Sequence, residues 1–138
     1  MNKNAIIIID DDEEDLELIK NAFAELNIDN KIIAFNDGHK FMEYVKVAEG
    51  GHFFILCDIN MRKIKGIELK KLIQDDEKLR LKCVPFIFLS TSSASASVLE
   101  AYSYGVQGYF IKPNDFEKLK SMLQDLVTYW SQSQHPNL

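Results

Sequence analysis

Short runs of apolar residues alternate along this chain with longer segments in which apolar residues recur at every third or fourth position. The first run, Ile6–Ile9, is continuous and β-branched, which is typical of a strand buried on both faces of a sheet. Four later runs have a similar character. The pattern predicts strands at 6–9, 31–35, 53–57, 86–89 and 109–111.

The segments between these runs show helical spacing of apolar residues, which predicts five helices. The last helix has the clearest apolar stripe, from Phe116 to Trp130. Asn114 is expected to cap it, with Glu117 three residues later completing a capping box. The charged stretch 75–82 is interpreted as a solvated helix end and loop.

Alternation of five strands with five helices predicts an α/β fold, a doubly wound (βα)5 domain whose parallel sheet is covered on both faces. Residues 1–130 are expected to form this single domain, followed by a polar and frayed tail at 131–138. With the flavodoxin-like strand order 2-1-3-4-5, the ligand crevice lies beyond the carboxyl ends of the first and third strands.

Six acids, residues 10–15, directly follow the first strand. Asp10 and Asp11 end that strand and Asp58 ends the third, so the three carboxylates are expected to meet at the crevice. Two such charges about 4 Å apart repel by roughly 4 kcal/mol at an effective dielectric constant near 20. A hard cation such as Mg²⁺, which prefers oxygen ligands, would compensate this repulsion. The alternative is that the acids only open the next helix, which we expect for residues 12–15.

Ser90 and Lys112 are expected at the same edge, since they end the fourth and fifth strands. A carboxylate such as Asp58 can also be a nucleophile that forms an aspartyl phosphate. The lysine would supply a compact positive charge for a phosphoryl group, and the serine a hydroxyl donor. Each of these residues taken alone would more often be structural.

The overall composition narrows the class of protein. With 21 acids against 16 bases and a net charge of -5, the chain lacks the basic character of a nucleic-acid binder. No apolar run approaches the roughly 20 residues that span a membrane, and no signal-peptide pattern is present. We expect a cytoplasmic protein in which Cys57 and Cys83 are buried free thiols. The three histidines do not cluster and are expected on the surface.

Four motifs, taken together, resemble the receiver domains of two-component response regulators, of the stand-alone single-domain type. The resemblance extends from Ile6 to about Trp130. The motifs are Ile-Ile-Asp10-Asp11, Asp58-Ile59-Asn60-Met61 with Gly66 eight residues after Asp58, the stretch 85–90, and Gly108-Tyr109-Phe110-Ile111-Lys112-Pro113.

This resemblance implies that Asp58 accepts a phosphoryl group from a histidine kinase. It also implies that Asp10, Asp11, Asp58 and the backbone carbonyl of Asn60 hold Mg²⁺, and that Lys112 pairs with the phosphoryl group. The protein would then be a signalling receiver rather than an enzyme, capable at most of self-phosphorylation from small donors and slow autodephosphorylation.

The resemblance further implies a conformational switch made by Ser90 and Tyr109. Thr91 falls one residue late, and one residue along a strand reverses the side-chain direction. The change would pass to the face formed by the fourth helix, the fifth strand and the last helix, which a downstream partner or a second copy in a homodimer would bind. The Lys112–Pro113 peptide bond is expected to be cis.

Three further positions could influence the site. Arg62 stands where the family most often has proline; it could influence access of metal or phosphodonor, although a solvated side chain is the default expectation. In this family Ser92, two residues after Ser90, and Asn60, two residues after Asp58, border the site and could tune how fast the phosphoaspartate hydrolyses.

Other functions remain open at this point. A phosphorelay intermediate would pass its phosphoryl group to a histidine phosphotransfer protein. A haloacid-dehalogenase-like phosphatase also uses an aspartyl nucleophile, but it places a second Asp two residues later, where this chain has Asn60, and usually after the first strand. A flavin carrier of the same topology would need a hydroxyl-rich phosphate loop where this chain has six acids.

Overall fold

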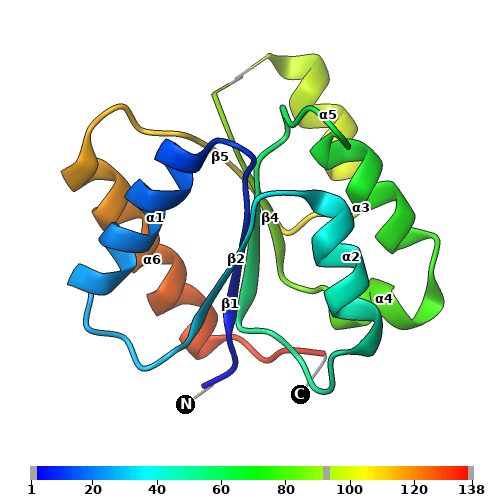
Figure 1. Cartoon of the computed structure of the whole chain (residues 1–138), viewed down its shortest axis with the longest axis horizontal. Coiled ribbons are helices and arrows are strands. Elements are labelled where there is room, and N and C mark those ends of the chain that lie inside the picture. Colours follow the sequence, from blue (N-terminus) through cyan, green and yellow to red (C-terminus); the bar gives the residue numbers. More distant parts are fainter. Residues whose placement is uncertain (1–2, 92–93, 137–138) are drawn as a thin grey trace.

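The computed structural model describes residues 3–91 and 94–136. Its centre is a parallel five-stranded sheet in the order β2-β1-β3-β4-β5, as the sequence predicted (Figure 1). The predicted strand positions are confirmed, with differences of at most one residue at their ends. The strands are β1 (Ile6–Ile9), β2 (Ile32–Phe35), β3 (Phe54–Cys57), β4 (Phe86–Ser90) and β5 (Gly108–Ile111).

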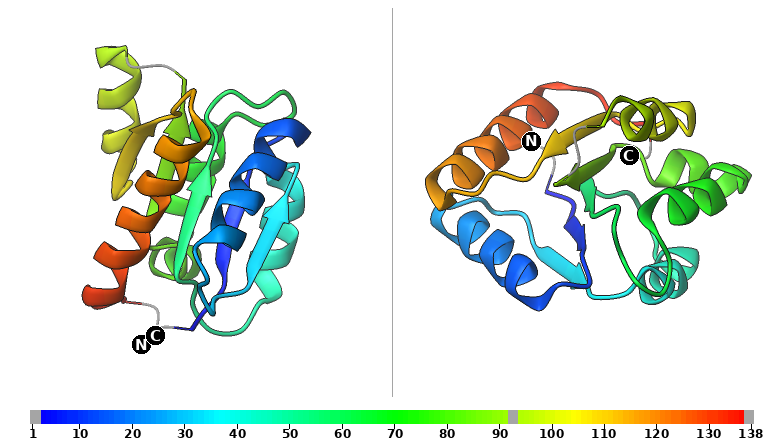
Figure 2. Two further views of the ribbon diagram at one scale, coloured as in Figure 1. Left: turned by 90° about the vertical axis from the view of Figure 1, so that its left-hand side faces the viewer. Right: turned by 90° about the horizontal axis from the view of Figure 1, so that it is seen from above.

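Helices cover both faces of this sheet. Figure 2 shows α1 and α6 together on one face and α2, α3, α4 and α5 on the other. The helices are α1 (Glu13–Glu25), α2 (Gly38–Val47), α3 (Gly66–Gln74), α4 (Glu77–Lys82), α5 (Ser95–Ser103) and α6 (Phe116–Gln132). Because α4 is additional, the fourth and last helices expected from the sequence are α5 and α6 here.

The isoleucines of β1 divide between two hydrophobic cores. Ile7 and Ile9 contribute to the core beneath α2, α3, α4 and α5, while Ile6 and Ile8 contribute to the core beneath α1 and α6. All four are buried. A strand with a core on each face has no polar side, which explains the continuous apolar run.

The charged stretch 75–82 forms the separate helix α4, so its interpretation as a helix end and loop was wrong. Asp76 caps the helix by accepting hydrogen bonds from the backbone N–H groups of Lys78 and Leu79. Leu79 is the one residue of this helix that is buried. A single buried side chain leaves no apolar stripe in the sequence, which is why the helix was missed.

The two ends of α6 also differ from expectation. Its cap is Asp115 rather than Asn114: the Asp115 carboxylate accepts the backbone N–H of Glu117 at 2.8 Å. Asn and Asp cap equally well, so the sequence did not separate the neighbours. The helix continues to Gln132, two residues into the expected tail. Beyond it, the His135 ring is buried and its Nε2 lies 2.8 Å from the carbonyl oxygen of Phe53.

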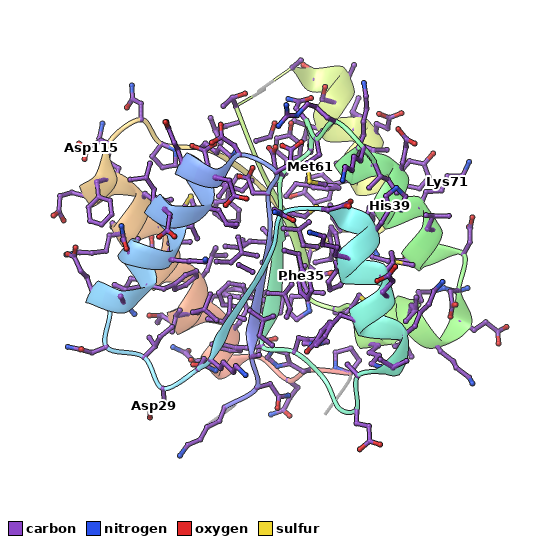
Figure 3. The ribbon with its side chains drawn as sticks, in the orientation of Figure 1. Asp29, Phe35, His39, Met61, Lys71 and Asp115 are labelled. Atoms are coloured by element: carbon purple, nitrogen blue, oxygen red, sulfur yellow. The ribbon has the colours of Figure 1, made fainter. Side chains whose placement is uncertain are left out.

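The histidine prediction was therefore wrong for two of the three residues. His135 is buried as described above, and His52 is buried beside Tyr44, whose hydroxyl lies 3.2 Å from its Nε2. Burial lowers the pKa of His52. His39 is exposed on α2, as expected (Figure 3).

The cis proline bond lies elsewhere than predicted. Within residues 3–91 and 94–136 the cis peptide bond is Val84–Pro85, and Lys112–Pro113 is trans. The cis and trans forms of any bond that precedes proline differ by only about 0.5–1 kcal/mol. The residue types alone therefore do not select which proline adopts the cis form.

Cys57 and Cys83 are both buried free thiols, as predicted. In the part of the chain that the structure describes, no helix is both long and apolar enough to cross a membrane.

Candidate functional site

Two neighbouring strands bring the candidate acids together. Ile9 of β1 is in register with Cys57 of β3, so the next residues, Asp10 and Asp58, leave the sheet side by side. The Asp58 N–H bonds to the carbonyl oxygen of Ile9 at 2.9 Å. One carboxylate oxygen from each of Asp10, Asp11 and Asp58 lies within 4.8 Å of the others. The predicted convergence of these three acids is confirmed, at the end of the sheet where Figure 3 labels Met61.

The Asp10 carboxylate is almost completely buried, with 1% of the residue exposed. Loss of hydration raises its pKa to about 6, even though the backbone N–H of Asp12 and the ammonium of Lys112 both favour the ionised form. Burial also raises the pKa of Asp58, against the opposing effect of Lys112. Two acids with raised pKa values in one crevice show that negative charge is costly here.

Lys112 supplies the positive charge at this site. The residue follows β5, and its N–H bonds to the Ser90 carbonyl oxygen at 2.8 Å, which places it beside the end of β4. Its Nζ lies 3.0 Å from Asp10 Oδ2, 3.3 Å from Asp58 Oδ1 and 2.9 Å from Asp15 Oδ2. Burial alone would lower the pKa of this lysine, but the three carboxylates raise it above its ordinary value. The ammonium is therefore a fixed cation of the site.

Asp15 is a site residue that the sequence analysis assigned only to the start of a helix. Asp12 is the residue that caps α1, accepting hydrogen bonds from the N–H groups of Glu14 and Asp15. Asp15 belongs to the first turn as predicted, but its carboxylate also reaches Lys112.

Arg62 also contacts the acids. Its backbone N–H donates to Asp11 Oδ2 at 2.8 Å, and its Nε lies 3.5 Å from the same oxygen. The side chain is 88% exposed, so the prediction of a solvated arginine is correct for most of its surface. The prediction did not include the contact with Asp11.

The candidate switch residues occupy neighbouring strands. Ser90 is completely buried at the end of β4, whereas Thr91 is exposed, which agrees with the preference for Ser90. Tyr109 is half-buried on β5, with its ring 6.4 Å from that of Phe88. Their role as a switch stays a prediction. Ser92 lies outside the described residues.

Asn60 lies two residues after Asp58 on the loop between β3 and α3, and it is exposed. Its backbone carbonyl as a metal ligand also stays a prediction. The close path of this loop depends on Gly66, where a Cβ atom would come within 2.5 Å of the Asp58 carbonyl oxygen. The Gly66 N–H bonds to the Ile59 carbonyl oxygen at 2.8 Å, which holds the loop beside Asp58.

The family model of the response regulator receiver domain matches residues 6–124. The chain belongs to this family. It is thus a receiver domain of two-component signalling, with the fold and strand order that the alternation of strands and helices predicted.

Individual relatives agree with this assignment. The receiver domain is 32% identical to the probable methanogenesis regulatory protein FilR2 of Methanothrix harundinacea, over 91% of this chain and 82% of that protein. It is also 32% identical to the chemotaxis protein CheY-3 of Vibrio cholerae, over 91% and 94% of the two chains. A crystal structure of a response regulator receiver domain from Rhodospirillum rubrum superposes with a TM-score of 0.85 at 26% identity, covering 96% of this chain and 97% of that one.

Membership in the family sets aside the phosphatase and flavin-carrier alternatives. Receiver domains are signalling proteins rather than classical enzymes, and they interact with histidine kinases and downstream partners. The acid cluster of Asp10, Asp11 and Asp58 fits a magnesium ion, since it offers hard oxygen ligands from three carboxylates close enough to share one cation.

Proposed function

We propose that this receiver domain is a phosphorylation switch in which Asp58 accepts a phosphoryl group from a histidine kinase. The observation that supports this most directly is the position of Asp58. Its carboxylate lies beside Asp10 and Asp11 and 3.3 Å from the Lys112 ammonium, at the crevice end of the sheet. A nucleophile, a set of metal ligands and a fixed cation therefore meet in one place.

In the proposed reaction an Asp58 carboxylate oxygen attacks the phosphorus atom of a phosphohistidine. The new P–O bond forms as the P–N bond breaks, and the leaving imidazole keeps the electron pair and takes up a proton from solvent. With acetyl phosphate as donor, the leaving group is acetate. Asp58 must be ionised to attack, and Lys112 favours that form by lowering the pKa that burial raises.

The other residues position and neutralise the phosphoryl group. Asp10, Asp11, Asp58 and the carbonyl of Asn60 are the proposed magnesium ligands. Bound magnesium would supply positive charge to the phosphoryl oxygens. Lys112 adds a second positive charge from the β5 side, and its ion pair with Asp10 holds it against the crevice.

The proposed output passes through Ser90 and Tyr109. The phosphoryl group carries about two negative charges, and the buried Ser90 hydroxyl would turn toward it as a donor. Tyr109, on the neighbouring strand, would then move inward. The surface that changes is the face of α5, β5 and α6, which carries exposed apolar side chains. These are Leu99, Tyr102, Ile111 and Tyr129. A downstream protein or a second copy would bind there, whereas in a phosphorelay a histidine phosphotransfer protein would take the phosphoryl group from Asp58 itself.

The phosphoacceptor assignment is tested by incubating the full chain with MgCl₂ and acetyl phosphate and measuring intact mass. We expect one phosphoryl group per chain, lost on mild hydrolysis and absent in Asp58→Asn. The control is Asp29→Asn, an exposed acid at the opposite end of the sheet (Figure 3), which should be modified like the wild type. An adduct on the Asp58→Asn protein, or none on the wild type, would contradict the proposal.

A further inference from the structure

The loop between β3 and α3 brings a second cation to the acid cluster. Arg62 lies on this loop, and its Nε is 3.5 Å from Asp11 Oδ2 while its backbone N–H donates to the same oxygen at 2.8 Å. Two contacts from one residue thus converge on a single carboxylate oxygen. This carboxylate is one of the magnesium ligands in the proposed function.

Arg62 and Lys112 divide the three carboxylates between them. Among residues 3–91 and 94–136, the ion pairs of Lys112 are with Asp10, Asp15 and Asp58, and that of Asp11 is with Arg62. Arg62 is therefore the cation that pairs with Asp11. A divalent ion bound by Asp11 would lie close to the guanidinium, and the two like charges would repel each other.

The residue type at this position controls two separate properties of Asp11. Every residue except proline offers the backbone N–H that holds Oδ2 toward the loop. Only arginine or lysine adds a positive charge. Arg62 does both, so replacing it with glutamine keeps the backbone N–H and removes the positive charge and its ion pair.

The surroundings allow the guanidinium to leave. Asp11 and Arg62 line the same surface pocket, with a volume of about 460 Å³. The side chain of Arg62 is 88% exposed and that of Asp11 is 20% exposed. Lys63, the next cation of the loop, is engaged elsewhere, 3.6 Å from Asp37. The exposed Arg62–Asp11 ion pair can therefore break. Surface ion pairs of this kind change a binding equilibrium by up to about five-fold.

We propose that Arg62 is a positioning residue that lowers the magnesium affinity of this receiver domain by pairing with Asp11. The inference rests on the proposed role of Asp11 as a magnesium ligand. Its consequence is that the domain needs more magnesium to be phosphorylated than the same domain without a cation at position 62. Arg62 would therefore set the magnesium concentration at which the switch operates.

Titration calorimetry of the full chain with MgCl₂ tests this directly. We expect Arg62→Gln to bind magnesium about two- to five-fold more tightly than the wild type, since the exposed ion pair is lost. Arg62→Lys should bind like the wild type. The difference in magnesium affinity between Arg62→Gln and the wild type should shrink as salt is added, because an exposed charge pair is screened.

The matched control is Lys63→Gln, which removes the same net charge from the same loop but from the Asp37 ion pair. We expect its magnesium affinity to change much less. Equal affinity in Arg62→Gln and the wild type would overturn this inference and leave the proposed function intact. An equal gain in magnesium affinity in Lys63→Gln would also overturn the inference, since the net charge of the loop, rather than the pairing with Asp11, would then explain the effect. A wild-type protein that binds no magnesium would overturn both.

Discussion

The shortest ion pair of the Lys112 ammonium is with Asp15, whose Oδ2 lies 2.9 Å away, against 3.0 Å for Asp10 and 3.3 Å for Asp58. The lysine thus joins the end of β5 to the first turn of α1 as well as to the two strands beneath the crevice. Asp15 is partly exposed, with 37% of its side chain accessible, while Asp10 is buried. Lys112 is shared between an acid of the helix and the acids of the site.

Asp15→Asn should increase the rate at which acetyl phosphate modifies Asp58. The substitution removes a negative charge that competes for Lys112 and that repels an incoming phosphoryl group. We expect an increase of about two- to five-fold, the size typical of a partly exposed ion pair. The measurement is the time course of the phosphoryl adduct by intact mass.

The control for this prediction is Glu14→Gln, which removes the neighbouring exposed charge on α1. Its rate should stay close to that of the wild type. A slower reaction in Asp15→Asn would mean that Asp15 helps to position Lys112 rather than competing for it.

The pH dependence of stability should carry the signature of Asp10. Its pKa rises from 3.8 to about 6 on folding, chiefly through burial, so the folded state binds this proton more tightly than the unfolded chain. The resulting stabilisation is present below about pH 4 and is lost as the pH rises through about 6. Urea unfolding in the presence of a chelator, at pH 4 and pH 7, measures this contribution.

Asp10→Asn removes that ionisation. At pH 7 we expect the variant to be more stable than the wild type by about 1–3 kcal/mol, since each pKa unit corresponds to about 1.4 kcal/mol. At pH 4 the two proteins should be nearly equal. If Asp10→Asn were more stable than the wild type by the same amount at both pH values, ionisation of Asp10 would not be the cause.

The sequence contained most of the information on the fold and on the position of the acids. The β1 run and the alternation of elements predicted the sheet, because a strand with a core on each face must be apolar throughout. The placement of Asp10 and Asp58 followed from where β1 and β3 end. These are local properties of residue type and spacing.

What the sequence did not predict depends on contacts between distant segments. The Asp15–Lys112 pair joins residues 97 positions apart, and the Arg62–Asp11 bond joins residues 51 positions apart. Neither follows from local spacing, because a charged side chain at a surface is as stable in water as in most ion pairs. The burial of His135 was missed for the same reason: only the folded sheet places the Phe53 carbonyl beside it.

Gly66→Ala should damage both stability and the site. The new Cβ would lie 2.5 Å from the Asp58 carbonyl oxygen and 2.9 Å from Ile59 Cα, and backbone atoms cannot move aside easily. We expect a loss of about 1–3 kcal/mol, as for overpacked sites, with slower modification of Asp58. Chemical unfolding and the acetyl phosphate time course measure the two effects.

Lys65→Ala is the matched control for this prediction, since Lys65 is exposed one residue earlier and its side chain makes no capping bond. It should leave both measurements close to those of the wild type. A Gly66→Ala protein as stable as the wild type would show that the loop has room to relax.

His135→Ala should destabilise the fold although the residue is close to the chain's C-terminus. The His135 ring packs 5.9 Å from the rings of both Phe53 and Trp130, and its Nε2 lies 2.8 Å from the Phe53 carbonyl oxygen. Truncation leaves that buried carbonyl without this partner and removes the ring from the core, for an expected loss of about 1–3 kcal/mol. Gln134→Ala, at an exposed neighbouring position, should unfold at the wild-type urea midpoint. Equal midpoints for both variants would instead support the frayed tail expected from the sequence.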